Sequence, residues 1–186
     1  MDIEDMSRFK RKDVALGENG GGGQREIETL IKCLAITKDE NLLHSLVWSL
    51  GENGSERAVE PLIDLLSDKR ELLRRDIAMS LEQIGGQRAI EVLLELLADE
   101  SQWVRRAAAE AMGCLKVRRA VEALLALLSD ESEYVRSAAA EALGKVCRRT
   151  DKDAIEVLSL VLGRTSEDEN VRAEAESAIL RIRRRN

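Results

Sequence analysis

The apolar residues of this chain recur in pairs of stretches, one rich in alanine and the next rich in leucine. In residues 99–129, the alanine-rich stretch begins near Val104 and the leucine-rich stretch near Ala120. Ala58, Ala89 and Ala120 hold the same place in successive leucine-rich stretches and are 31 residues apart. A constant period of this length predicts a solenoid, because one unit cannot bury its apolar face alone and must stack on its neighbours.

Apolar residues spaced three and four positions apart predict a helix in each stretch. The expected helices cover residues 26–36, 42–50, 58–66, 72–84, 89–97, 103–115, 120–128, 134–146, 154–162 and 171–182. We expect Leu94 and Leu125 to lie in the core. No β-branched run alternates with period two, so the fold class is all-α without a sheet.

Each alanine-rich helix follows a polar residue with Glu or Gln three positions later, the spacing of a helix-capping box. The five pairs are Thr37 and Glu40, Asp68 and Glu71, Asp99 and Gln102, Asp130 and Glu133, and Ser166 and Glu169. We expect the first residue of each pair to cap the helix, although Asp in place of Ser or Thr is a looser form.

Residues 1–24 are expected to be an irregular N-terminal segment before a repeat domain of residues 25–186. Residues 15–20 resemble residues 49–54, so residues 5–17 are expected to be the second helix of a degenerate first repeat, with a disordered tail as the alternative. The glycine run 20–23 follows and is expected to hold no helix. The loops at 148–153 and 163–168 are longer than their equivalents, and such insertions map to the edges of a solenoid.

Composition narrows the class of protein. Of the 186 residues, 44% are hydrophobic, 34% are charged and only one is proline, which favours an all-helical chain. The net charge of −6 argues against a general nucleic-acid binder, which needs a basic surface to neutralise phosphates. No run of about 18 apolar residues is present, so we expect no membrane span.

The thiols and the N-terminus suggest a compartment. Cys33, Cys114 and Cys147 are too few and too scattered for a disulfide framework or a CxxC metal site. The first residues lack the apolar core of a signal peptide. We therefore expect a cytoplasmic protein with reduced thiols.

The repeats resemble the short HEAT-like repeats named after phycobilisome lyases, over about residues 25–183. In one repeat the matching residues are Asp99, Val104, Arg105, Ala108, Ala109, Ala111, Gly113, Arg119, Ala120 and Val121. In the next they are Asp130, Val135, Arg136, Ala139, Ala140, Ala142, Leu143 and Gly144, and an earlier repeat matches at Arg57, Ala58, Val59, Pro61, Leu62 and Ile63. The first full repeat departs most, with Leu42 and Leu43 where the family has Val-Arg.

This resemblance implies a right-handed α-α superhelix, a HEAT-like solenoid of about five helix pairs plus a terminal half repeat. It also implies that the alanine-rich helices line the concave side. Their small side chains lead to the same expectation, since closer stacking of one row bends the solenoid toward it. Such repeats are scaffolds for many purposes, so the function stays open.

A helical wheel places a further set of positions beside the buried stripe of each alanine-rich helix. We call seven of these residues the candidate strip: Trp48, Leu72, Met79, Trp103, Glu110, Tyr134 and Glu141. The strip holds three of the four aromatic residues of the chain, and aromatics are enriched at interface hot spots. We expect it to bind an apolar and basic segment of another protein; alternatively, the rings cover gaps between helices.

Nothing in the sequence supports catalysis, a cofactor or a metal. His44 is the only histidine, which excludes a multi-His metal centre within one chain. Deoxyhypusine hydroxylase, an enzyme of HEAT-like repeats, binds iron through His-Glu pairs, and none occurs here. The alternative function is that of a bilin lyase subunit or an accessory to a cofactor-attaching enzyme, with Cys114 on the face of the strip.

The arginines fit two readings. One set follows the valine or leucine that recurs once per repeat: Arg74, Arg105, Arg136 and Arg172. We expect these arginines to hydrogen-bond the aspartates between repeats, which are Asp68, Asp99 and Asp130. The doubled arginines, such as 118–119 and 148–149, could instead form a basic edge for phosphate groups, although nearby acids disfavour nucleic acid. Self-association through the end repeats is a third hypothesis for the chain.

Overall fold

The computed structural model describes residues 22–164 and 167–184, and within these ranges the chain forms helices and turns without a strand. This confirms the all-α fold. The helix expected over residues 5–17 lies outside the described residues. No described helix is both long and apolar enough to cross a lipid bilayer.

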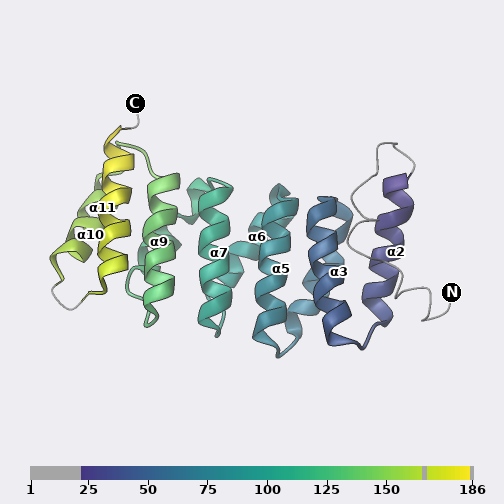
Figure 1. The fold of residues 1–186 in the computed structure, drawn as a ribbon. Helices are drawn as coiled ribbons and strands as arrows, with labels where there is room; N and C mark the ends of the chain where they lie inside the picture. Colours follow the sequence, from purple (N-terminus) through teal and green to yellow (C-terminus); the bar gives the residue numbers. More distant parts are fainter. Residues whose placement is uncertain (1–21, 165–166, 185–186) are drawn as a thin grey trace.

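The alanine-rich helices stand side by side, and we call them the A row (Figure 1). They are α3 (Glu40–Asn53), α5 (Glu71–Ile84), α7 (Gln102–Cys114), α9 (Glu133–Val146) and α11 (Glu169–Arg184). The helix α2 (Gly22–Ile36) stands at the end of the stack next to α3. The described part thus contains four complete pairs, flanked by α2 and by α11 as the terminal half repeat.

The leucine-rich helices are shorter and lie behind the A row (Figure 1). They are α4 (Val59–Ile63), α6 (Gly86–Leu96), α8 (Val121–Leu127) and α10 (Lys152–Gly163). A 3₁₀ turn over Glu56–Ala58 precedes α4, a second over Asp64–Ser67 follows it, and a third over Arg118–Ala120 precedes α8. Pro61 therefore lies in the first turn of α4, where its missing amide has no intrahelical partner to lose.

Two local expectations are wrong. Helix α2 begins at Gly22, so two glycines of the run 20–23 do lie in a helix; at the first turn a glycine breaks no intrahelical amide bond. Leu93 and Leu124 are fully buried, whereas Leu94 and Leu125 are only partly buried against the core. The fully buried leucine of each of these two helices is therefore one residue earlier than expected.

The caps also differ, because the helices of the A row begin at the Glu or Gln of each predicted box. Ser101 precedes α7, and its hydroxyl accepts a hydrogen bond from the Trp103 amide at 3.3 Å. Asp39 does the same for α3 through the Leu42 amide at 2.8 Å. Asp99 lies two residues before Ser101, the residue that caps α7, and its carboxylate accepts from the Ser101 amide. The Asp99 carboxylate can therefore also accept hydrogen bonds from Arg74 of the preceding repeat.

Neighbouring helices of the A row approach almost backbone to backbone. A Cβ added at Gly113 of α7 would lie 2.9 Å from the Cα of Ala142 in α9. One added at Gly144 of α9 would lie 2.8 Å from the Cα of Ala178 in α11. Carbon atoms do not pack that closely, so these positions require glycine and set the spacing of the row.

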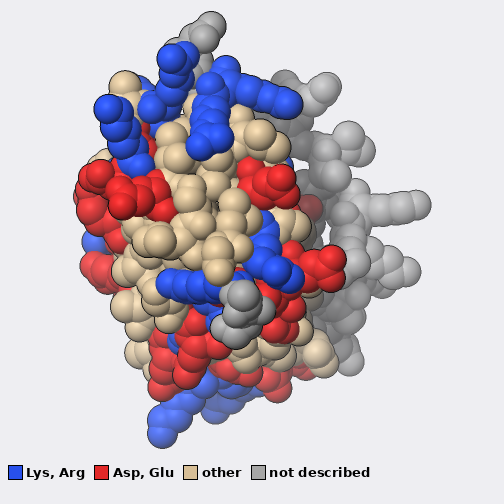
Figure 2. Space-filling model, turned by 90° about the vertical axis from the view of Figure 1, so that its left-hand side faces the viewer, with Lys and Arg blue, Asp and Glu red and all other residues tan. Residues whose placement is uncertain are grey.

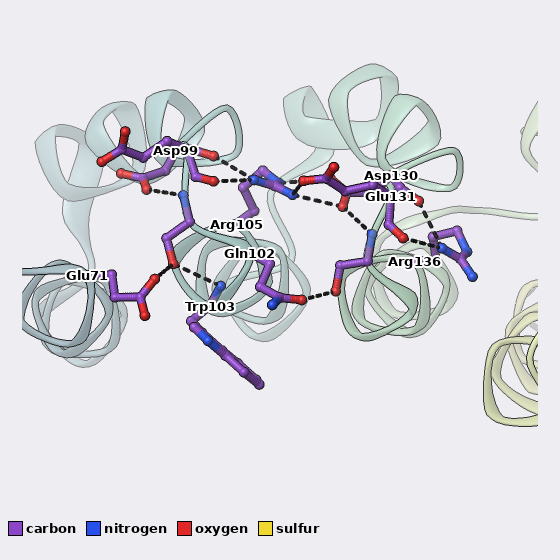
Figure 3. A network of polar contacts seen from close by, with 11 residues as sticks. Glu71, Asp99, Gln102, Trp103, Arg105, Asp130, Glu131 and Arg136 are labelled. Atoms are coloured by element: carbon purple, nitrogen blue, oxygen red, sulfur yellow. Dashed lines mark hydrogen bonds and ion pairs between the residues drawn. The ribbon is translucent and has the colours of Figure 1, made fainter.

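Buried arginines join each repeat to the next (Figure 3). Arg105 of α7 is 8% exposed and grips the Asp130 carboxylate with two N–H groups, at 2.8 and 2.9 Å. Its third nitrogen donates to the carbonyl oxygens of Asp99 and Glu100, both at 2.9 Å. Arg74 binds Asp99 in the same way, so the expected ladder of arginine and aspartate is confirmed at Asp99 and Asp130. The Asp68 carboxylate instead accepts from Arg70, and Arg74 reaches only the Asp68 backbone carbonyl.

The last rung uses a different acid. Arg136 of α9 donates to Glu167, at 2.7 and 3.0 Å. This acid lies 31 residues after its arginine, whereas Arg74 and Arg105 reach aspartates 25 residues on, because the loop before α11 is longer. For Arg172 of α11, no carboxylate partner lies among residues 22–164 and 167–184.

A second set of contacts lies beside the arginines (Figure 3). The hydroxyl of Ser101 lies 2.6 Å from the carboxylate of Glu71, and that of Ser132 lies 2.5 Å from the amide oxygen of Gln102. Both serines thus contact the first residue of the preceding A-row helix, and Ser101 in addition caps its own helix through its side chain, which Ser132 does not. Hydrogen bonds thus link capping within a repeat to stacking between repeats.

The ladder holds its acids in the charged form. Burial alone would raise the pKa of the Asp130 carboxyl, but hydrogen bonds from Arg105 and the Ser132 amide outweigh it and lower the pKa. The Glu167 pKa is lowered in the same way by Arg136. At Asp68, the side chain and backbone amide of Arg70 lower the pKa to about 2.

We predict that Arg105→Ala lowers the free energy of unfolding by about 3 kcal/mol or more, because it leaves the Asp130 carboxylate buried without its partner. The matched control is the next residue: Arg106→Ala removes an exposed pair with Glu110 and should cost less than about 1 kcal/mol. Urea unfolding followed by circular dichroism measures both. Equal losses would show that the ladder contributes no more than a surface pair.

We also predict acid lability between about pH 4.5 and pH 2. Groups whose pKa is lower in the folded state stabilise the fold above their unfolded pKa, and this stabilisation is lost as the pH falls toward the folded value. Asp130→Asn should flatten the fall in unfolding free energy over this window. Asp64→Asn, at an exposed aspartate of the turn after α4, should leave the slope as in wild type; equal flattening by both would contradict the prediction.

Candidate functional site

The residues of the candidate strip lie on consecutive helices of the A row. Trp48 lies on α3, Leu72 and Met79 on α5, and Tyr134 on α9, with exposed fractions between 37% and 49%. Trp103 on α7 is half-buried and stacks on Tyr134, with ring centroids 5.5 Å apart and planes inclined by 30°. The stacking brings two predicted anchors from neighbouring repeats into one aromatic surface.

The repeat explains this alignment. Leu72, Trp103 and Tyr134 are each the second residue of their helix, so the same helical geometry sends all three to the same height of the row. Trp48 and Met79 occupy a position two turns further along α3 and α5. The apolar part of the strip therefore runs along the first-turn ends of α5, α7 and α9 and widens over α3 and α5.

The two acids of the strip have partners on their own helices. Glu110 accepts from Arg106 at 2.8 Å, and Glu141 lies 3.1 Å from the Lys145 ammonium. Each pair is four residues apart along a helix, the usual spacing of such surface pairs. Their charges are thus offset locally, and the apolar side chains dominate this part of the face.

His44 takes part in a contact that the sequence did not predict. Its Nδ1 lies 2.6 Å from the carboxylate of Asp76, which also accepts from Arg75 at 2.7 Å. This joins α3 to α5 beside Trp48. His44 and Asp76 are 32 residues apart, one more than the period. They therefore occupy nearly equivalent places on neighbouring A-row helices, which was the only sign of this contact in the sequence.

The first-turn ends of the A row carry exposed acids that the sequence interpretation also missed. They are Glu40, Glu71, Glu100, Glu131 and Glu133. The side chains of Glu100 and Glu131 are 83% and 85% exposed although each also touches a buried arginine. Lys38, Lys69 and Arg70 oppose them at the α3 and α5 end. Negative charge therefore borders the line of Leu72, Trp103 and Tyr134, most strongly at α7 and α9.

The remaining candidates offer little chemistry. Burial raises the pKa of the Cys114 thiol, and the neighbouring Glu82 carboxylate raises it further. A protonated thiol is a poor nucleophile. Cys33 and Cys147 are buried. Within the described residues, no group of three His, Cys, Asp or Glu side chains could hold a metal ion.

Solved structures with similar folds include proteins of different activities. A chain of the complex of CpcE and CpcF of phycocyanin lyase from Nostoc sp. PCC7120 is 28% identical, with a TM-score of 0.68; the match covers 84% of this chain and 64% of that one. A designed armadillo repeat protein in complex with the peptide (KR)4 is 21% identical, with a TM-score of 0.61 and coverage of 89% and 87%.

Human deoxyhypusine hydroxylase, in complex with glycerol, is 21% identical, with a TM-score of 0.53 and coverage of 86% of this chain and 74% of that one. At this identity the likeness shows the fold alone. A comparison with curated proteins gives no match.

The sequence matches the family of HEAT repeats over residues 27–113 and 90–180, which together span most of the chain. This agrees with the 31-residue period, the paired helices and the stacked A row. Solenoids of this kind are typical of protein-interaction scaffolds, and HEAT and armadillo-like stacks commonly bind other proteins or peptides. The chain belongs to the HEAT repeat family.

Proposed function

We propose that this protein is a non-catalytic scaffold or assembly factor that binds an apolar and basic segment of another protein along the candidate strip. The observation that carries the proposal is the alignment of Trp48, Leu72, Met79 and the stacked pair of Trp103 and Tyr134 on one face. Large apolar side chains that are gathered on one exposed face mark interaction sites more often than isolated ones do.

The alternative, that the rings only cover gaps between helices, explains part of the strip. Trp103 is half-buried, and its stacking on Tyr134 covers the junction of α7 and α9. It does not explain Leu72, Met79 and Trp48, whose side chains remain exposed on α5 and α3. Burying each such side chain in an interface would contribute roughly 1.5–3 kcal/mol before the cost of association.

The preference for a basic partner rests on the exposed glutamates beside the strip rather than on the two acids of the strip itself. Glu110 and Glu141 are offset by Arg106 and Lys145. The exposed glutamates at the first-turn ends, Glu100, Glu131 and Glu133, remain available to cations of a bound segment. A designed stack of similar fold holds a Lys-Arg peptide, which is compatible with this geometry but does not identify the partner here.

The position of the strip on the concave side is part of the same proposal. The close contacts at Gly113 and Gly144 support it, since they shorten the spacing of the A row. A row with shorter spacing than the row behind it lies on the inside of the curve. A concave face could surround an extended or helical segment.

We predict that the triple variant Trp48→Ala, Trp103→Ala and Tyr134→Ala weakens binding of such a segment at least tenfold, since each aromatic hot spot is worth about 2 kcal/mol. Twelve-residue peptides selected from a random display library against the wild type serve as ligands. We expect the selected peptides to combine large apolar residues with Lys or Arg.

The matched control is Ile36→Ala, Leu160→Ala and Leu180→Ala, which truncates three exposed apolar residues outside the strip. Circular dichroism checks that both variants fold. If the control loses affinity as strongly as the strip variant, or if no selected peptide combines large apolar residues with Lys or Arg, the proposed site is wrong.

A second candidate function is that of a bilin lyase subunit or an accessory to a cofactor-attaching enzyme. The similarity to the phycocyanin lyase complex favours it, although this chain spans only 64% of that one. The raised pKa of Cys114 does not favour covalent attachment to that thiol. Under the scaffold proposal, a bilin added to the protein should keep its absorption spectrum. A shifted spectrum that Trp103→Ala abolishes would favour the lyase function instead.

A further inference from the structure

The opposite ends of the A-row helices carry a concentration of cations, which we call the basic edge. It consists of residues 116–119, residues 148–153 up to the start of α10, and the last residues of α11, 181–184. Its exposed cations are Lys116, Arg118, Arg119, Arg148, Arg149, Lys152, Arg181, Arg183 and Arg184. Only two carboxylates, Asp151 and Asp153, lie in the same segments. This contrasts with a net charge of −6 for the whole chain.

Figure 2 shows Lys and Arg side chains gathered along the upper edge of the α10 and α11 end, while acids cluster lower on the same face. Arg118 donates to the Val146 carbonyl at 3.2 Å and to the Asp151 carboxylate at 3.1 Å, which joins the first segment to the second. A Cβ added at Gly144 of α9 would lie 3.7 Å from the Arg181 side chain, so the end of α11 lies beside α9. The cations therefore lie at the same end of three neighbouring helices, α7, α9 and α11.

One of these cations occupies a strained position. Lys116 has a φ of 53°, in the left-handed region, and Gly85 and Gly54 hold the same place one and two periods earlier, with φ of 67° and 69°. The turn needs this conformation, because the Val117 amide bonds back to the Met112 carbonyl at 3.0 Å. Left-handed backbone costs a residue with a side chain more than glycine. A lysine here suggests that its charge serves another purpose.

We propose that the basic edge binds an acidic protein segment, rich in Asp and Glu. This site is separate from the line of Leu72, Trp103 and Tyr134 in the candidate strip. Those residues lie in the first turns of their helices, whereas the basic edge lies where α7, α9 and α11 end. Arginine matches carboxylates with two parallel N–H groups. Arg118 already grips the Asp151 carboxylate in this way, with both terminal nitrogens.

A nucleic acid fits the edge less well. Proteins that bind single strands usually stack bases on aromatic side chains, and the three segments contain none. Binding to a duplex draws on a positive domain, whereas this chain is acidic as a whole. A short acidic segment needs only a few arginines at one edge and meets less of the negative surface elsewhere.

The test measures fluorescence anisotropy of a labelled twelve-residue peptide in which six Asp and Glu residues alternate with Ser and Gly. A single-stranded RNA of seven nucleotides, which carries six phosphates, is the comparison ligand. The variant Arg119→Gln, Arg148→Gln and Arg183→Gln removes three exposed charges of the edge. The control, Lys32→Gln, Lys38→Gln and Lys69→Gln, makes the same charge change elsewhere on the surface.

We expect wild type and control to bind the peptide with similar affinity and the edge variant to bind at least tenfold more weakly. Added salt should weaken wild-type binding. Lys116→Gly should also weaken binding while leaving the melting midpoint unchanged or raised, since glycine relieves the left-handed strain. This result separates a binding role for the lysine from a structural one.

Three results would overturn the proposal. They are failure of millimolar peptide to saturate the wild type at low salt, a loss of affinity in the control as large as in the edge variant, and tighter binding of the RNA than of the peptide. The last would assign the edge to phosphate recognition. None of these results bears on the strip, whose residues are unchanged in every variant.

Discussion

The stack depends on a buried guanidinium that belongs to two repeats at once. Arg105 satisfies the carbonyl oxygens of its own turn and the Asp130 carboxylate of the next one. Taking an arginine and an aspartate out of water is costly, and only such complete hydrogen bonding offsets it. The same geometry at Arg74 and Arg136 fixes the offset of each repeat relative to its neighbour. A leucine-rich interface without these contacts would tolerate small slips along the row.

The glycines complete this constraint from the other end of the helices. Gly113 and Gly144 allow α7, α9 and α11 to meet nearly backbone to backbone, while the arginines tie the turns at the opposite end. With both ends fixed, the side chains at the second residue of α5, α7 and α9 share one height. The alignment of Leu72, Trp103 and Tyr134 follows from the packing of the repeats, and so does the stacking of the last two rings.

Much of this was predictable because the repeat averages out local ambiguity. The period located every described helix to within a few residues, and the arginine ladder followed from charges that recur at the same step. The caps were misassigned because one aspartate serves two repeats. Asp99 has the residue type and spacing of a cap. Its carboxylate, however, accepts hydrogen bonds from Arg74, and Ser101 caps the helix instead. A pattern within one repeat cannot reveal this competition.

Contacts that break the period were not predictable from it. Arg136 meets Glu167 31 residues on, instead of 25 as for Arg74 and Asp99, and only the folded loop before α11 shows which acid reaches Arg136. The bond of His44 to Asp76 depends on residues that occur once. The candidate strip could be placed on the right helices from a wheel, but the stacking of its rings and the pairing of its acids depend on side-chain conformations that no wheel provides.

The separation of charge along the A row has a structural explanation that accounts for only part of it. Helix dipoles favour acids at the first turn and cations at the last, which explains Glu71 and Glu133 at one end and Arg181 and Arg183 at the other. It does not explain Arg118, Arg119 and Lys152, which stand where the leucine-rich helices begin and where the dipole disfavours a cation. Nor does it explain a lysine in the left-handed position of Gly54 and Gly85. The cations that the dipole does not account for lie together on the basic edge, where a negatively charged partner would stabilise them.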